Sequence, residues 1–326
     1  MTATNKNQNS EGFVKRFFLP MLILGILSFF VACQDESTIQ PEADTDEAAL
    51  LKIADEDSAL SSFDPNFDEG SESEFLGKTN TDIYPFKVGH HMKLVNRNLN
   101  ITFEGDTAYG VLTKTFDGTL FIKGSYDPNA TNPDTLIKKV FSATVTRNIV
   151  FIKIANTTNR LKNWRIAAIS LPEGGTQSPN IDITKLTAFL PNGDTLVINS
   201  PNDYYLVRNW GYWWRWNHIP TVLLNQDVTL RVELNSAYAD SDFVTLTFGA
   251  DRNGMHRVKK QFELVSSTQN GNIYEKVYER TFTPNHSLGF HHAIINAMPK
   301  QVVYDDQTAV EMESWGIPYY LRLFPF

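Results

Sequence analysis

The stretch Asn98-Leu99-Asn100-Ile101-Thr102-Phe103 alternates polar and apolar residues one by one. Successive side chains of a strand point to opposite faces, so this alternation predicts a β-strand with one buried face. The pattern extends outward from this stretch, through Tyr109, Val111 and Thr113 to a turn expected at Asp117-Gly118. It continues to residue 171, so the first half of the chain is predicted to consist of strands joined by turns.

The second half repeats this pattern after the cluster Pro172-Glu173-Gly174-Gly175. We interpret that cluster as a domain boundary, because proline and glycine interrupt strands. Asn-Gly, a strong hairpin signal, occurs at 192–193, 253–254 and 270–271. Strands are expected beyond the boundary at residues 181–190, 195–198, 228–234, 244–248, 258–265, 273–282, 288–298 and 310–315.

These patterns predict an all-β protein with tandem β domains at residues 78–175 and 176–326. Short strands at this spacing are typical of an immunoglobulin-like sandwich, which we expect for the second domain. The first domain is expected to be a smaller sandwich, or a curved sheet carrying one helix around Val88–Asn96. The single cysteine excludes a disulfide within the chain, so the fold has to rely on its core.

Residues 1–33 have the features of a secretory signal. Lys15 and Arg16 precede an apolar run from Phe17 to Val31, and Ala32 and Cys33 follow. The run is shorter than the roughly twenty residues that a membrane-spanning helix needs. Basic residues, a short apolar run and a small residue together indicate a signal peptide.

The residues Phe30-Val31-Ala32-Cys33 resemble a lipobox, whose cysteine receives a diacylglycerol group before cleavage. The usual first residue is leucine, and Phe30 resembles the looser lipoboxes of Bacteroidota lipoproteins. The following Gln34-Asp35-Glu36 resembles their acidic export tag. The resemblance implies a lipid on Cys33 and an outer-membrane location, at the cell surface or on the periplasmic face. A plain anchor helix, or a conventional signal with a free cysteine, is the alternative.

Short motifs farther along the chain resemble two-domain lipoproteins of Bacteroidota. They are Glu104-Gly105-Asp106-Thr107-Ala108, Asn163-Trp164-Arg165-Ile166, Tyr304-Asp305-Asp306 and Trp315-Gly316-Ile317-Pro318-Tyr319. This resemblance covers most of residues 82–326 and implies the same location and architecture. No activity is known for that group, so the resemblance implies no chemistry.

Residues 34–77 are expected to form an acidic, disordered stalk. From Gln34 to Leu76 the chain has fourteen acidic residues and one basic residue, Lys52. Like charges repel and extend a chain that has little apolar surface to bury. The alternative is a leader that packs on the folded part, and Ala48 to Ile53 has the composition for one or two helical turns. The remaining chain is near neutral with no basic face, so we do not expect nucleic-acid binding.

No motif for a nucleophile, a phosphate loop, a zinc protease or a dinucleotide occurs, and we expect neither an enzyme nor a cofactor. His90-His91 and His291-His292 are adjacent pairs, and His286 is near the second. Neighbours on a strand face opposite ways, so we expect one packed and one exposed histidine per pair rather than a metal site. A paired-carboxylate hydrolase stays open, because only the separation of the two groups would be diagnostic.

The most unusual stretch is Trp210-Gly211-Tyr212-Trp213-Trp214-Arg215-Trp216-Asn217-His218. Flat aromatic faces suit sugar rings and protein partners, so Trp210, Tyr212, Trp213, Trp214, Arg215 and Trp216 are candidate ligand-binding residues. The alternative is that these rings belong to the core, since aromatic residues also dominate cores.

The sequence therefore favours a membrane-anchored lipoprotein that acts as a binding module for a glycan or a protein. The alternatives are a lipid-anchored hydrolase with acid and base residues still to be assigned, and a structural envelope protein without a small ligand. Binding is favoured because a module needs only a suitable surface, whereas an enzyme needs converging catalytic groups.

Overall fold

The computed structural model describes residues 44–57, 60, 83–209, 215–250 and 258–324. These described residues gather into one compact unit. Its described part is built mostly from antiparallel strands, with two α-helices and two short 3-10 turns. The prediction of an all-β protein is confirmed.

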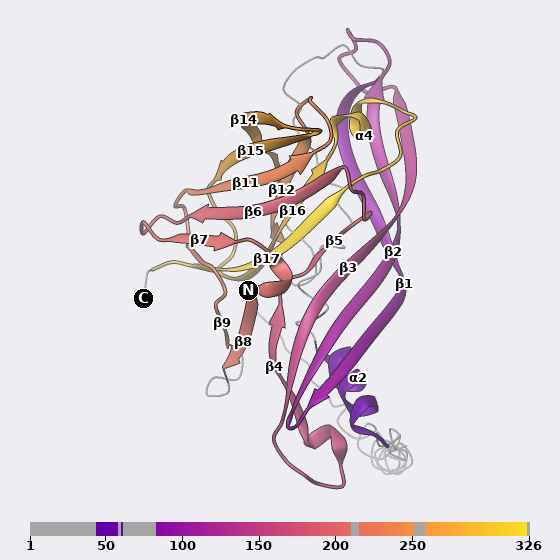
Figure 1. The fold of residues 1–326 in the computed structure, drawn as a ribbon. Coiled ribbons are helices and arrows are strands. Elements are labelled where there is room, and N and C mark those ends of the chain that lie inside the picture. The colour runs from indigo at the N-terminus through magenta and orange to yellow at the C-terminus, as the bar shows by residue number, and fades with distance from the viewer. Residues whose placement is uncertain (1–43, 58–59, 61–82, 210–214, 251–257, 325–326) are drawn as a thin grey trace, which may run out of the picture. The chain divides into compact units, whose positions relative to one another are not determined.

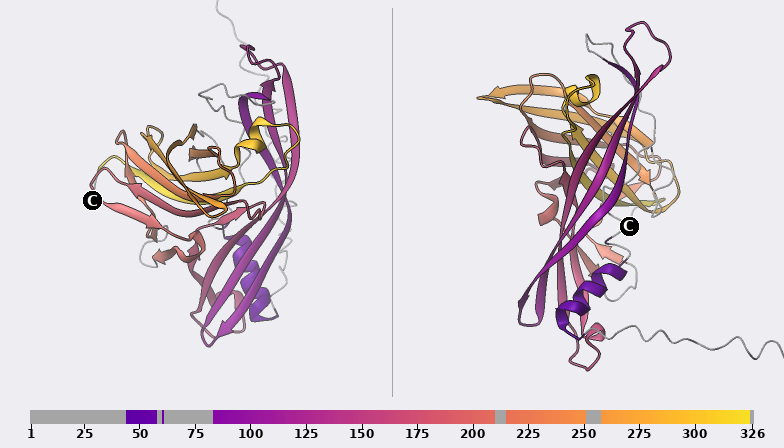
Figure 2. Two further views of the ribbon diagram at one scale, coloured as in Figure 1. Left: turned by 45° about the horizontal axis from the view of Figure 1, so that its top comes forward. Right: turned by 90° about the vertical axis from the view of Figure 1, so that its right-hand side faces the viewer.

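The larger of two sheets, sheet A, begins with three long strands, β1 (Tyr84–Glu104), β2 (Thr107–Ser125) and β3 (Thr135–Lys153). They run side by side with a pronounced twist (Figures 1 and 2). The free edge of β3 pairs with β4 (Trp164–Ser170) and with β5 (Glu173–Gly175). From β4 the sheet continues to β8 (Tyr205–Asn209) and β9 (Arg215–Asn217). From β5 it continues to β17 (Glu313–Arg322), β16 (Gly289–Met298), β12 (Phe243–Ala250) and β13 (Val258–Gln261), and β10 (Thr221–Leu223) joins β17 in parallel.

Sheet B has five strands in the order β14 (Glu263–Asn270), β15 (Ile273–Phe282), β11 (Val228–Ser236), β6 (Ile181–Phe189) and β7 (Thr195–Ile198). It packs on the β12, β16 and β17 part of sheet A. The rings of Phe248 in β12 and Phe282 in β15 meet across this interface, with centroids 4.6 Å apart. The expected sandwich in the second half is therefore present, built from two facing sheets with a shared apolar core.

The boundary expected between residues 175 and 176 does not divide the molecule into separate units. Strand β5 pairs with β3 on one side and with β17 on the other, so sheet A runs through it. The two glycines are needed there for close packing. A Cβ on Gly174 would lie 2.3 Å from the Thr144 carbonyl oxygen, and one on Gly175 would lie 2.1 Å from that of Met312.

Two local predictions in the first half are wrong. The helix suggested around Val88–Asn96 is part of strand β1, which pairs with β2 along its length. The turn expected at Asp117-Gly118 is the middle of β2. Gly118 pairs with Phe141, and a Cβ on it would lie 2.3 Å from the Phe141 ring, so the glycine leaves space for that ring. The β1–β2 turn is formed instead around Gly105, whose φ is 61°.

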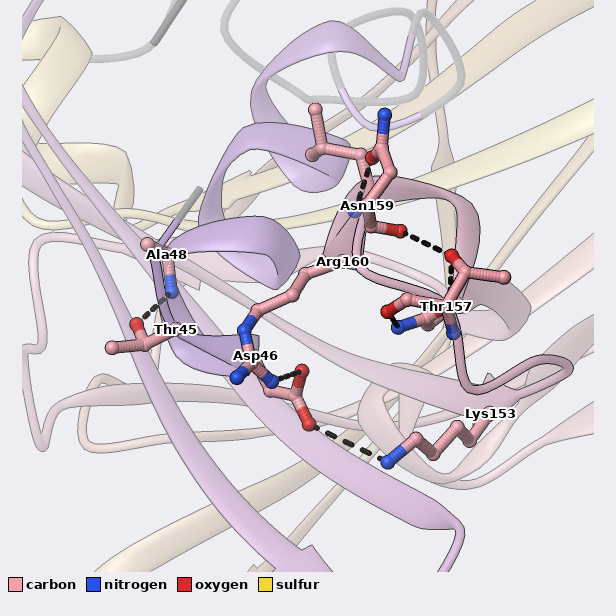
Figure 3. Close-up of polar contacts among 9 residues, drawn as sticks. Thr45, Asp46, Ala48, Lys153, Thr157, Asn159 and Arg160 are labelled. Carbon is pink, nitrogen blue, oxygen red and sulfur yellow. Dashed lines mark hydrogen bonds and ion pairs between the residues drawn. The ribbon is translucent and has the colours of Figure 1, made fainter. Parts of the chain in front are cut away.

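The prediction of a stalk over residues 34–77 is wrong for the part that the structure describes. Residues 46–56 form helix α2 (Asp46–Glu56), which begins at an N-cap whose Thr45 hydroxyl accepts from the Ala48 N–H at 3.0 Å (Figure 3). Leu50 and Ala54, four residues apart, are at most 1% exposed and belong to the main core. The spacing of its few apolar residues therefore outweighs the acidity of this segment.

The acidic residues of α2 find basic partners on the strands and turns around it. Asp46 pairs with Arg160 at 2.8 Å and lies 3.7 Å from Lys153 (Figure 3). Asp57 pairs with Arg208 of β8 at 2.9 Å. Such partly exposed pairs contribute roughly 0 to 1 kcal/mol each, so the buried apolar side chains supply most of the docking free energy.

The remaining helical elements are η1 (Arg160–Lys162), η2 (Pro201–Asp203) and α4 (Lys300–Tyr304). Helix α4 contributes to a second apolar cluster with β1, β2 and β16. Its carbonyl end is held by the Lys139 ammonium, which donates to the carbonyl oxygens of Val302 and Thr308 at 2.8 Å each. This lysine ties α4 and the loop after it to strand β3.

Candidate functional site

A polar pocket of about 480 Å³ opens where β3, β5 and β17 of sheet A meet the start of β6 in sheet B. The loop at residues 177–179 and the turn η2 complete its wall. Three kinds of polar side chain line it. Hydroxyl groups come from Thr144, Thr146 and Ser178, amide groups from Gln177 and Asn202, and carboxyl groups from Glu173, Asp182 and Glu313. Among the described residues that line it, none is Lys, Arg or His.

Glu313 connects the two sheets at the base of this pocket. Its Oε1 accepts from the Trp315 indole N–H at 2.8 Å, and its Oε2 accepts from the backbone N–H of Ile183 in β6. The pKa of Glu313 is raised to about 8, mainly by burial, with a smaller contribution from the nearby Asp182 and Glu173 and against the effect of those two hydrogen bonds. Glu313 therefore carries a proton over much of the neutral range.

Glu173 is the second carboxyl of the pocket. Its pKa is also raised, first by burial and then by the charges of Asp182 and Asp203. Its Oε2 lies 3.3 Å from the amide nitrogen of Asn202. Because this hydrogen bond is long, the Glu173 carboxyl can still accept a hydrogen bond from a ligand.

Asn202 is held in place by three neighbours. Its Nδ2 donates to the Thr146 hydroxyl at 2.9 Å, and its backbone carbonyl accepts from Asn148 Nδ2 at 2.9 Å. Ser170 lies near its Oδ1 at 3.4 Å. The two N–H groups of the amide donate to Thr146 and Glu173, so its Oδ1 is the atom that can still accept a hydrogen bond from a ligand. The fixed position of this amide favours binding, because little side-chain entropy is left to lose.

The aromatic segment lies largely outside the described residues. Trp210, Tyr212, Trp213 and Trp214 fall there, and only the backbone of Arg215 is described. Trp216 is half-buried against the main core, and the Arg208 guanidinium lies 4.9 Å from its ring centroid. For Trp216 the packing alternative therefore has direct support, and the roles suggested for the other residues stay predictions.

The histidines behave differently in the two pairs. His90 is buried and His91 exposed, as expected for neighbours on a strand. His291 and His292 are both 2% exposed, so that expectation is wrong for the second pair. The reason is that β16 lies inside sheet A, between β12 and β17, and both of its faces are covered.

His286 joins His291 and Tyr319 in a small aromatic cluster. Its ring centroid lies 4.2 Å from that of His291, and its Nε2 is 2.7 Å from the Tyr319 hydroxyl. Burial lowers the pKa of His286 to about 4, with a further contribution from His291. Among the described residues, no group of three or more His, Cys, Asp or Glu is placed to hold a metal ion.

The residues that build the pocket were not singled out from the sequence. Glu173 and Glu313 are far apart in the chain, and only the pairing of β5 with β17 brings them together. Glu173 belongs to the Pro-Gly cluster that we interpreted as a boundary, and Glu313 lies two residues before Trp315 of the last motif. Both glutamates thus lie in or beside stretches that the sequence analysis had noted, but nothing in the sequence indicated that the two carboxyl groups share a pocket.

A scan against protein-family models and a search of the curated proteins matched neither a family nor a relative. Within the described part of the chain, no helix has the length and apolar character needed to cross a membrane. The case for a function therefore depends on the pocket and on the sequence.

Proposed function

We propose that this protein is a lipoprotein, anchored to the outer membrane through Cys33, that acts as a binding module for a glycan. The observation that carries the ligand class is the composition of the pocket between β3, β5, β6 and β17. As far as the structure describes them, its walls combine hydroxyl, amide and carboxyl groups with no basic side chain. A polyhydroxylated ligand can donate to carboxyl oxygens and accept from amide N–H groups, and it carries no negative charge to repel.

Two features favour neutral sugars over anionic ones in this pocket. The carboxylates of Asp182 and Glu173 would repel a carboxylate or a phosphate. The side chains of Met312, Pro179 and Ile181 add apolar surface beside these polar groups. Sugar rings present both hydroxyls and C–H groups, so they suit a wall of this mixed kind.

A hydrolase is the second candidate, favoured by one observation. Two carboxyls with raised pKa values, Glu173 and Glu313, line the same pocket. A carboxyl group with a raised pKa keeps its proton near neutral pH and can act as a general acid. Against it, both oxygens of Glu313 already accept hydrogen bonds from Trp315 and Ile183, so this carboxyl is occupied with joining the sheets. Binding without turnover is therefore the stronger reading.

The glycan proposal is tested by a glycan array with the native protein and the Asn202→Ala variant. We expect specific signals from native protein that fall at least about fivefold in the variant, since leaving a buried polar group of the ligand without its partner costs roughly 1 to 3 kcal/mol and Asn202 also positions Thr146. Equal signals would exclude the pocket. Release of reducing sugar from a bound glycan, abolished in Glu173→Gln, would favour the hydrolase instead.

The anchor is tested separately by labelling cells with a radioactive fatty acid. The native protein should take up the label and the Cys33→Ser variant should not. Label in neither protein, or in both equally, would contradict the lipid on Cys33. The glycan proposal would not be affected by that result, because it depends on the pocket.

A further inference from the structure

A second pocket, of about 590 Å³, opens at the edge of the sandwich where the chain passes from one sheet to the other. Strand β13 ends at Gln261 in sheet A, and β14 begins at Glu263 in sheet B. Phe262 makes the crossing, and its backbone N–H donates to the Val244 carbonyl at 2.9 Å. The two sheets are therefore open to solvent at this edge, and β13 and β15 form opposite walls of the pocket.

Lys260 of β13 lies on the face of sheet A that points toward sheet B. It pairs directly with Leu246, and residues paired across two strands project from the same face. Leu246 is fully buried in the main core, which fixes that face as the inner one. The Lys260 ammonium lies 6.0 Å from the ring centroid of Phe248, on the same inner side.

Arg280 of β15 faces it from sheet B. It stands between Tyr278 and Phe282, two positions away from each, and both of these neighbours are buried on the inner face of the sheet. Lys260 and Arg280 both line the pocket. Two cations thus approach the same space from opposite walls.

The negative charge nearby compensates these cations only weakly. Glu263 lies 3.3 Å from Arg280, but its side chain is 77% exposed, so the pair is largely screened by water. The Arg280 Nε–H is buried and has no hydrogen-bond acceptor among the described residues. Lys260 has no carboxylate within 4.0 Å in the described part of the chain.

The carboxylate at the back of the pocket is already neutralised. Asp242 pairs with Lys276 at 2.8 Å, and both side chains are fully buried. Asp242 also accepts from the Ser236 hydroxyl at 2.9 Å and from the Tyr278 hydroxyl at 3.2 Å. Its charge is therefore engaged by Lys276 and does not offset Lys260 and Arg280.

We propose that this pocket between β13 and β15 binds an oxyanion, such as a carboxylate, sulfate or phosphate group, between Lys260 and Arg280. An arginine presents its N–H groups in a fixed fork that matches two oxygens of such a group, and an ammonium adds a second charge. The anion would supply the acceptor that the buried Arg280 Nε–H lacks. This site is distinct from the carboxyl-lined pocket and does not depend on the glycan proposal.

Equilibrium dialysis of the full chain in detergent tests this site, with radioactive inorganic phosphate and sulfate as probes at constant ionic strength. We expect about one bound anion per chain, with affinity reduced at least about tenfold in Arg280→Gln and in Lys260→Gln. The matched control is Arg231→Gln, which removes an arginine from the outer side of sheet B, where it pairs with Glu279. The control should bind like native protein.

Three results would overturn the proposal: no binding by native protein, no loss in the two pocket variants, or an equal loss in Arg231→Gln. Circular dichroism of each variant checks that it is folded. Competition then identifies the source of the anion. Displacement by a sulfated oligosaccharide at far lower concentration than free sulfate supports an anionic group on a larger ligand, and equal potency supports a small free anion. Asn202→Ala should leave anion binding unchanged, which separates this test from that of the glycan pocket.

Discussion

Replacing Glu313 by Gln should remove a large part of the pH dependence of folding stability. The pKa of Glu313 is about 8 in the folded protein, against 4.5 for an unperturbed glutamate. The folded state therefore holds a proton that the unfolded chain has already lost. The stability from this group is complete below about pH 4.5 and is lost as the pH rises toward 8.

The size of the effect follows from these two values. Each pKa unit corresponds to about 1.36 kcal/mol, so the full loss is about 5 kcal/mol. Between pH 5 and pH 8 the free energy of unfolding should fall by about 3.5 kcal/mol through Glu313 alone. In Glu313→Gln this component is absent, and any contribution from Glu173, whose pKa is also raised, remains in both proteins.

Urea unfolding at closely spaced pH values measures this difference. Because glutamine resembles the neutral carboxyl, the native and Glu313→Gln curves of stability against pH should lie closest at low pH and separate as the pH rises, with the native curve falling more steeply. Trp315→Phe is the matched control, because it removes one hydrogen bond to Glu313 and keeps the carboxyl. It should lower stability while retaining a fall at least as large as the native one. Parallel curves for native protein and Glu313→Gln would refute the assignment of a proton to this carboxyl.

Three further substitutions test the core, the leader and the junction of the sheets. Lys276→Met should destabilise the protein by about 3 to 5 kcal/mol, because it leaves the buried Asp242 carboxylate uncompensated, and adding Asp242→Leu should recover most of that loss in urea unfolding. Leu50→Ala should cost about 2 to 5 kcal/mol and make helix α2 the first site of limited proteolysis, whereas a freely extended leader would show no change. Gly174→Ala should lower the melting temperature by several degrees, since its Cβ would meet the Thr144 carbonyl, and an unchanged value would contradict the close packing of β5.

The strands could be predicted from the sequence because their signal is local. Alternation places six of the eight strands predicted in the second half within two residues of their observed bounds, and Ile273–Phe282 is matched in full. The single strand predicted at 258–265 is wrong, because the chain crosses there from β13 in sheet A to β14 in sheet B, and the strand predicted at 310–315 is observed as β17 at Glu313–Arg322. Turn signals are more ambiguous. Asp117-Gly118 has the composition of a hairpin turn, but its glycine leaves space for Phe141 on the neighbouring strand. A glycine under a cross-strand ring and a glycine in a turn look alike until the pairing is known.

Helix α2 and the pocket depend on partners that are distant in the chain. The acidic residues of α2 suggest a solvated stalk when they are counted alone, and a docked helix once Arg160 and Arg208 are known to lie beside them. The same holds for Glu173 and Glu313, which meet only because β5 lies between β3 and β17. A single sequence reveals amino-acid composition and hydrophobic periodicity, whereas these contacts depend on how the strands are arranged in the sheets.

The most direct test of the glycan pocket is isothermal titration of the strongest oligosaccharide from the array into three proteins. These are the native protein, Asn202→Ala in the pocket, and Trp216→Ala in the aromatic segment, where Trp216 packs against the core beside Arg208. The account predicts that Asn202→Ala weakens binding at least about fivefold and that Trp216→Ala changes it by less than about threefold. Full affinity in Asn202→Ala together with a large loss in Trp216→Ala would contradict it and place the glycan on the aromatic segment instead.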